Sequence, residues 1–106
     1  DACHPMLPFM AQGACQAVED AVELAARLAP SAESGDRAGV PSALRHYEHA
    51  RRTRTARVQR MSAGNRDRYH LPDGPEQVRR DAGFGSSGDP LAPFDWLYSH
   101  RSGRDE

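Results

Sequence analysis

The sequence lacks lysine, has only two cysteines and few aromatic residues, and contains no long apolar run. Apolar residues make up 38% of the 106 positions and aromatic residues 7%, a small supply for an independent core. A membrane-spanning helix needs about 20 consecutive apolar residues, and no segment approaches that length. No signal-peptide pattern opens the chain. These absences argue against a membrane span and against a large core.

The scarcity of cysteine limits metal chemistry. Cys3 and Cys15 have only His4 beside them, so the ligand set of a zinc site is incomplete. A disulfide between the two thiols is conceivable, but the simplest interpretation is two small, reduced, buried residues. We therefore expect a cytoplasmic protein without a bound metal.

Charge is unevenly distributed along the chain. All 14 basic residues are arginine, which we attribute to GC-rich coding. Residues 1–40 carry a balance of −4, residues 41–71 a balance of +6, and residues 72–106 a balance of −3. Acidic ends around a basic middle indicate that these segments pair with one another or with other parts of a protein.

The periodicity predicts a mainly α-helical chain with two long helices joined by loops. Residues 13–29 have an Ala-rich apolar arc opposite a polar arc, and Pro30 is expected to end this helix. The apolar arc consists of Ala14, Ala17, Val18, Ala21, Leu24, Ala25 and Leu28, and the polar arc of Gln16, Glu19, Asp20, Glu23 and Arg27.

A second, Arg-rich helix is expected from Pro41 to about Ala63, with Gly64-Asn65 as its stop. Its packing stripe is Leu44, Tyr47, Arg51, Thr55, Val58 and Ser62, with Arg54 and Met61 beside it. The two arginines on or near this face are either paired with carboxylates or partly solvated.

The rest of the chain reads as loops and one short helix, without a convincing strand. We expect a short helix at 76–82, a flexible stretch at 83–88, a segment at 89–98 that folds back on a core, and a disordered tail at 101–106. The expected parts are a loop and helix at 1–30, a linker at 31–40, the Arg-rich helix at 41–66, and a docking segment with tail at 67–106.

The most informative stretch is residues 1–14, DACHPMLPFMAQGA, followed by a helix that contains Glu19-Asp20-Ala21. It resembles the second flavin-binding motif of the class A flavoprotein monooxygenases. In that motif an acidic residue at a strand end precedes a proline-bearing loop, a glycine and a helix. The sequence PFMAQGA at 8–14 is similar to that of the salicylate hydroxylase branch of this class. The similarity continues through ALRHYE at 43–48, YHLPDGP at 69–75 and FDWLY at 94–98.

The resemblance implies an FAD-dependent enzyme in which NAD(P)H reduces the flavin and O2 supplies the oxygen that hydroxylates a small aromatic substrate, a phenolic acid. It implies that Asp1 binds the ribityl chain and that Pro8 lies beside flavin and substrate. Gly13, Ala14 and Cys15 would face the flavin pyrimidine edge at a helix start, where unpaired amides and the helix dipole favour negative charge. The chain contains neither an assigned general base nor a Gly-x-Gly-x-x-Gly motif for the adenosine half of the cofactor.

Because the chain starts with Asp1 inside the motif, we expect a C-terminal fragment of an α/β FAD-binding fold of the p-hydroxybenzoate hydroxylase type. The dinucleotide-binding sheet of its N-terminal part would be missing, and the full-length parent could be a homodimer. The apolar arc of the first helix complements the Arg-interrupted stripe of the second helix poorly. We therefore expect that sheet to be its natural partner, and the 106 residues alone to be inactive.

Two other functions remain open. Eight arginines within residues 45–68 could bind nucleic acid phosphates, but they spread around the helix and the neighbouring segments are acidic, so nucleic-acid binding is not expected. The other alternative is a non-catalytic helical interaction module.

Overall fold

The computed structural model describes residues 2–85 and 88–103. All regular structure in these ranges is helical, and no strand occurs in them, in agreement with the sequence. The α-helices are α1 (Gly13–Ser34), α2 (Val40–Tyr69), α3 (Pro75–Gly83) and α4 (Asp95–Tyr98). Three short 3-10 helices are η1 (Pro8–Met10), η2 (Arg37–Gly39) and η3 (Ala92–Phe94).

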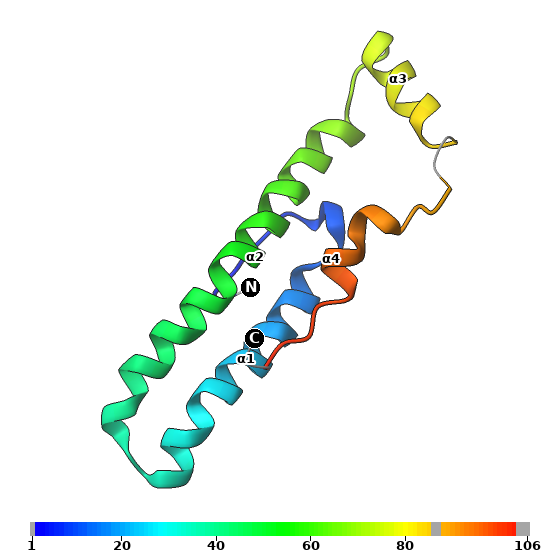
Figure 1. Ribbon diagram of the computed structural model, residues 1–106. Coiled ribbons are helices and arrows are strands. Elements are labelled where there is room, and N and C mark those ends of the chain that lie inside the picture. The colour runs from blue at the N-terminus through cyan, green and yellow to red at the C-terminus, as the bar shows by residue number, and fades with distance from the viewer. Residues whose placement is uncertain (1, 86–87, 104–106) are drawn as a thin grey trace.

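Helices α1 and α2 form an antiparallel hairpin that gives the molecule its elongated shape (Figure 1). Its principal extents are 61 × 26 × 18 Å, and its radius of gyration is 18.2 Å. A compact chain of this length has a radius of gyration of about 13 Å. Much of the hairpin surface is therefore not covered by other elements of this chain.

The first helix is longer than the sequence predicted, because it continues through Pro30 to Ser34. A proline in a helix interior removes one hydrogen bond and costs about 3 kcal/mol, so an end at Pro30 was expected. The Ser34 hydroxyl donates to the carbonyl of Pro30 over 2.8 Å, and Gly35 ends the helix with a φ of 71°. The left-handed glycine, not the proline, is the true stop signal. The linker expected at 31–40 is correspondingly shorter.

The second helix also extends beyond its predicted stop, since α2 passes through Gly64-Asn65 and ends at Tyr69. A glycine inside a helix costs about 1 kcal/mol relative to alanine. Here the residues around Gly64 make tertiary contacts, because Ser62 and Asn65 donate to carbonyls of the N-terminal loop. These contacts explain why the helix is retained across a weak position.

The polar face of α1, and not its apolar arc, packs against α2. The buried residues of α1 are Gln16 and Glu23, whereas Val18 is 64% exposed and Val22 46% exposed. The apolar arc is left largely uncovered, in line with its expected poor fit to the Arg-interrupted stripe of α2. Carboxylates on α1 meet arginines on α2, and this electrostatic match outweighs the poor fit of the apolar surfaces.

The packing face of α2 is close to the predicted one. Arg51, Thr55, Val58 and Ser62 are buried, as the periodicity indicated. The prediction that Leu44 belongs to the packing face is wrong, since Leu44 is exposed and its neighbour Ala43 is buried instead. Ala43 lies in the first turns of α2, next to the turn of the hairpin.

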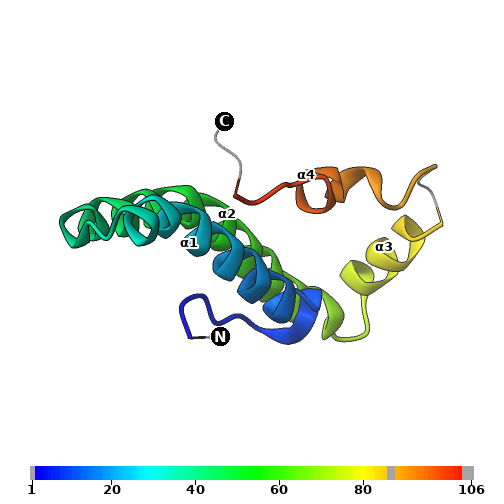
Figure 2. The same cartoon turned by 90° about the horizontal axis from the view of Figure 1, so that it is seen from below.

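The C-terminal segment lies along the hairpin on the side opposite the N-terminal loop (Figure 2). Leu97 of α4 is buried, and the backbone amide of Gly103 donates to Oε2 of Glu23 over 2.7 Å. Part of the tail expected to be disordered is thus in contact with α1, while residues 104–106 and the middle of the stretch at 83–88 lie outside the described residues. Helix α3 is present as predicted and buries no residue.

Candidate functional site

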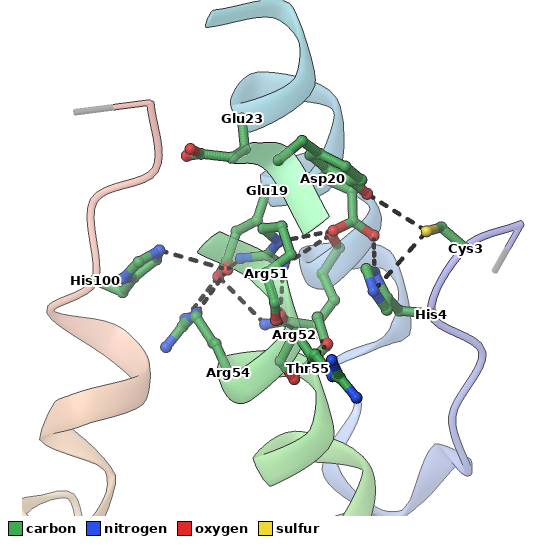
Figure 3. A network of polar contacts seen from close by, with 12 residues as sticks. Cys3, His4, Glu19, Asp20, Glu23, Arg51, Arg52, Arg54, Thr55 and His100 are labelled. Atoms are coloured by element: carbon green, nitrogen blue, oxygen red, sulfur yellow. Dashed lines mark hydrogen bonds and ion pairs between the residues drawn. The ribbon is translucent and has the colours of Figure 1, made fainter. Parts of the chain in front are cut away.

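Arg51 is the centre of the polar interface between the two long helices (Figure 3). It is 1% exposed, and its guanidinium contacts three side chains of α1. Nε donates to Oδ1 of Asp20, Nη1 to Oε2 of Glu19, and Nη2 to Oε1 of Gln16, each over 2.7 Å. The sequence left open whether this arginine is paired with carboxylates or partly solvated. In the structure it is paired with the carboxylates of Glu19 and Asp20.

Arg54 joins α1 to the C-terminal segment. Its Nε and Nη2 donate to the two carboxylate oxygens of Glu19, each over 2.7 Å. The same guanidinium donates to the carbonyls of Trp96 and Leu97 over 3.0 and 2.9 Å. One arginine of α2 therefore contacts both α1 and α4.

The network keeps its carboxyl groups ionised. Burial by itself raises the pKa of Glu19, but hydrogen bonds and charges from Arg54 and Arg51 outweigh it, so the pKa lies below the ordinary 4.5. Burial likewise opposes ionisation of Asp20, and contacts with His4 and Arg51 outweigh it and lower its pKa below 3.8. These carboxylates are consequently charged at neutral pH and serve as ion-pair partners, not as proton donors.

His4 connects the N-terminal loop to this network. Its Nδ1 lies 2.8 Å from Oδ2 of Asp20, and its Nε2 lies 3.8 Å from Sγ of Cys3 (Figure 3). The Tyr47 hydroxyl donates to the same sulfur over 3.5 Å. Burial raises the pKa of Tyr47 above its usual range, and the adjacent Cys3 and Asp20 act in the same direction. His4 thus connects the N-terminal loop to α1 through Asp20.

The residues expected to contact the cofactor lie at or before the start of α1. Asp1 lies outside the described residues, and Pro8 opens η1. Gly13, Ala14 and Cys15 are the first three residues of α1. Cys3 and Cys15 are both free thiols and exposed, so the expectation that they are buried is wrong.

The start of α1 suits an electron-rich ring edge. The first amides of any α-helix have no intrahelical acceptor. At this helix the Gln12 side chain does not cap them, and Ala14 and Cys15 are exposed. Unpaired donors at the positive end of a 22-residue helix favour a negatively charged group. The residues present therefore fit the pyrimidine edge of a flavin.

An open pocket of about 380 Å³ lies beside the same loop. It is lined by Pro8, Phe9, Met10, Ala11, Asn65, Tyr69, Phe94 and Tyr98. Phe9 and Tyr69 meet edge to face with centroids 6.4 Å apart, and Phe94 and Tyr98 do so at 6.5 Å. The pocket places Pro8 next to aromatic rings from both ends of the chain, a proximity that the sequence did not reveal.

Several arginines of α2 are engaged within the molecule. Besides Arg51 and Arg54, Arg57 stacks on Trp96 with 3.6 Å between Cζ and the ring centroid, and Arg66 pairs with Asp67. Fewer arginines are therefore available to bind phosphates than the sequence count indicated. No cluster of three or more potential metal ligands occurs among the described residues. None of the helices in the described ranges is both long enough and apolar enough to cross a membrane.

Comparison with known proteins places this chain in a family. Residues 1–62 match the model of the FAD binding domain family, which is more than half of the chain. The chain belongs to this family.

The relatives of the chain include proteins named monooxygenases or hydroxylases. The chain is 41% identical to the 3-amino-4-hydroxybenzoate 2-monooxygenase of Streptomyces cremeus over 97% of its own length and 25% of the relative. It is 42% identical to the 3-hydroxybenzoate 6-hydroxylase 1 of Aquipseudomonas alcaligenes over 92% of its length and 23% of the relative. It is 49% identical to the 6-hydroxynicotinate 3-monooxygenase of Bordetella bronchiseptica over 61% of its length and 16% of the relative. The chain thus spans a quarter or less of the length of these proteins, and no solved structure matches it.

Proposed function

We propose that this chain forms the flavin-facing part of an FAD-dependent monooxygenase that hydroxylates a phenolic acid with NAD(P)H and O2 as co-substrates. The observation that carries the proposal is the exposed start of α1, which opens at Gly13 without a side-chain cap, directly after the loop that contains Pro8. Membership of the FAD binding domain family supports FAD as the ligand of this helix end.

Within the proposal, each residue has a definite role. The amides of Gly13, Ala14 and Cys15 hold the flavin pyrimidine edge and stabilise negative charge on it. Pro8 forms a rigid wall beside the ring, and the Asp1 carboxylate accepts hydrogen bonds from ribityl hydroxyls. FAD, when bound, supplies the electron transfer and the activation of O2.

The finer parts of the proposal concern the whole protein. We place it in the salicylate hydroxylase-like branch, in the cytoplasm, with a dinucleotide-binding sheet from an N-terminal part completing the cofactor site. A homodimer is the proposed assembly. The names of the relatives, two of which are hydroxybenzoate enzymes, support a phenolic acid as the substrate class.

The proposal is tested on the complete product of the gene that encodes residues 1–106. We expect a yellow protein that consumes NAD(P)H and O2 and hydroxylates a phenolic acid from a panel of hydroxybenzoates. Product formation is followed by chromatography and mass spectrometry. A colourless product that does not bind added FAD would contradict the proposal.

The role of Asp1 is tested with Asp1→Ala in the same protein. Loss of a hydrogen bond to a charged group costs about 1.5–3 kcal/mol, so the FAD dissociation constant should rise roughly ten- to a hundredfold. Asp73→Ala, at an exposed turn residue, is the matched control and should leave the constant unchanged. An unaltered constant for Asp1→Ala would show that another group binds the ribityl chain.

A further inference from the structure

The loop before α1 is held by a row of polar side chains on α2. Gln59 Nε2 donates to the carbonyl of Pro5 over 2.8 Å, Ser62 Oγ donates to the carbonyl of Leu7, and Asn65 Nδ2 donates to the carbonyl of Phe9 over 3.1 Å. The donors stand at every third position of the helix, and the acceptors at every second position of the loop. We call Gln59, Ser62 and Asn65 the donor row.

Helix and loop advance by similar but unequal steps, and the loop shortens its step where it tightens into η1 after Leu7. Three residues of an α-helix complete most of one turn and advance about 4.5 Å, so every third side chain stays on one stripe. In an extended chain, alternate residues face the same side, and two residues span about 6.6 Å. Leu7 is extended, with φ −67° and ψ 152°, and the tighter η1 begins directly after it. Loop and helix therefore run in the same direction and stay in contact over five loop residues.

The loop depends on this row because it makes few backbone hydrogen bonds of its own. Pro5 and Pro8 have no N–H group. Within the described loop residues the Ala11 amide donates to the Pro8 carbonyl over 2.9 Å, and Ala11 has a positive φ of 52°. Ser62 is fully buried, so its hydroxyl has no access to water as an alternative partner.

We propose that Gln59, Ser62 and Asn65 are positioning residues, which place Pro8 and the start of α1 against the flavin. This inference rests on the proposed function. The donor row reaches the loop on both sides of Pro8, at Leu7 and Phe9, and so fixes the distance of this proline from α2. Because α1 begins four residues after Phe9, the same contacts fix where its unpaired amides lie.

The experiment uses the complete gene product and the variants Ser62→Ala and Asn65→Ala. Ser42→Ala is the matched control, since Ser42 is an exposed residue of the same helix. Amide hydrogen exchange is followed by mass spectrometry, and FAD affinity by flavin fluorescence. We expect faster exchange confined to residues 6–12 and a rise in the FAD dissociation constant of about three- to tenfold for each variant. The visible circular dichroism of bound flavin should also change.

A conservative replacement separates positioning from general stability. Asn65→Gln keeps an amide donor at a half-buried position and should restore most of the exchange pattern and the FAD affinity. Equal loosening of α1, α2 and the loop, or an FAD affinity and flavin circular dichroism unchanged in Ser62→Ala and Asn65→Ala, would overturn the inference. If the protein without substitutions does not bind FAD, the proposed function itself is overturned. This result differs from the one in which all variants bind FAD as tightly as the protein without substitutions.

Discussion

Arg51 and Asp20 form a 2.7 Å hydrogen-bonded ion pair between α2 and α1, in which Arg51 is buried and Asp20 is partly buried. Charged groups of this kind are costly to bury unless they are paired. The pair also determines which face of α1 is turned toward α2, since Asp20 belongs to the polar arc of that helix. The relationship between these two residues therefore decides how the hairpin is assembled.

Arg51→Met should strongly destabilise the hairpin. Removing one partner of a buried ion pair leaves the other charge uncompensated and costs about 3–5 kcal/mol, a large part of the roughly 5–15 kcal/mol that stabilises a typical protein. Urea unfolding followed by circular dichroism measures this loss. Arg52→Met, at the exposed neighbouring position, should change the free energy of unfolding by less than about 0.5 kcal/mol.

A double variant tests the pair directly. Arg51→Met combined with Asp20→Asn should be less destabilised than the sum of the single variants, because the uncompensated carboxylate is removed. Additive effects would show that the two residues stabilise the hairpin independently.

The hairpin should lose stability in acid. The pKa values of Glu19 and Glu23 are lowered in the folded chain from an ordinary value of 4.5, because ion pairs and hydrogen bonds outweigh burial. The unfolded chain therefore takes up protons first as the pH falls. Their contribution is complete above pH 4.5 and is lost as the pH falls from there through the lower folded values.

Urea titrations at a series of pH values between about 7 and 3 test this dependence. Glu19→Gln should give a shallower decline below pH 4.5 than the unaltered chain. Asp73→Asn, at an exposed turn position, serves as the control and should give the same slope as the unaltered chain. An identical slope for Glu19→Gln would contradict the assignment.

The fluorescence of Trp96 should report the attachment of α4. This residue is the only tryptophan, and Arg54 donates to its carbonyl while Arg57 covers its ring. Arg54→Ala removes the bonds to Trp96 and Leu97, so the emission should shift to longer wavelength and acrylamide quenching should increase. Arg60→Ala, exposed on the same helix, is expected to leave both unchanged.

Residues 1–106 expressed alone should bind a hydrophobic dye and should not retain FAD. The apolar arc of α1 is largely exposed, including Val18 and Val22, and each such side chain forgoes part of the roughly 1.5–3 kcal/mol that full burial contributes. The measurements are the fluorescence of the added dye and the quenching of flavin fluorescence at micromolar protein concentration. Val18→Ser should reduce dye binding without lowering helicity. Quenched flavin fluorescence with the 106 residues alone would contradict this prediction.

The sequence by itself determined the helical class, the approximate position of both long helices and much of the stripe on α2. Period and composition are local properties, and they suffice to indicate an amphipathic helix. The motif at residues 1–14 similarly indicated the family, because its spacing is read directly along the chain.

Only the tertiary structure decided which face of α1 meets α2, where both helices end, and what holds the loop that carries Pro8. Hydrophobic periodicity indicates the apolar arc of α1 as its packing face. In the structure Arg51 and Arg54 pair with the acidic arc instead, and these partners lie more than 30 positions away along the chain. Pro30 and Gly64 are local stop signals that more distant contacts or a later cap overrode. The sequence did not reveal the donor row either, since its donors and acceptors lie more than 50 positions apart along the chain.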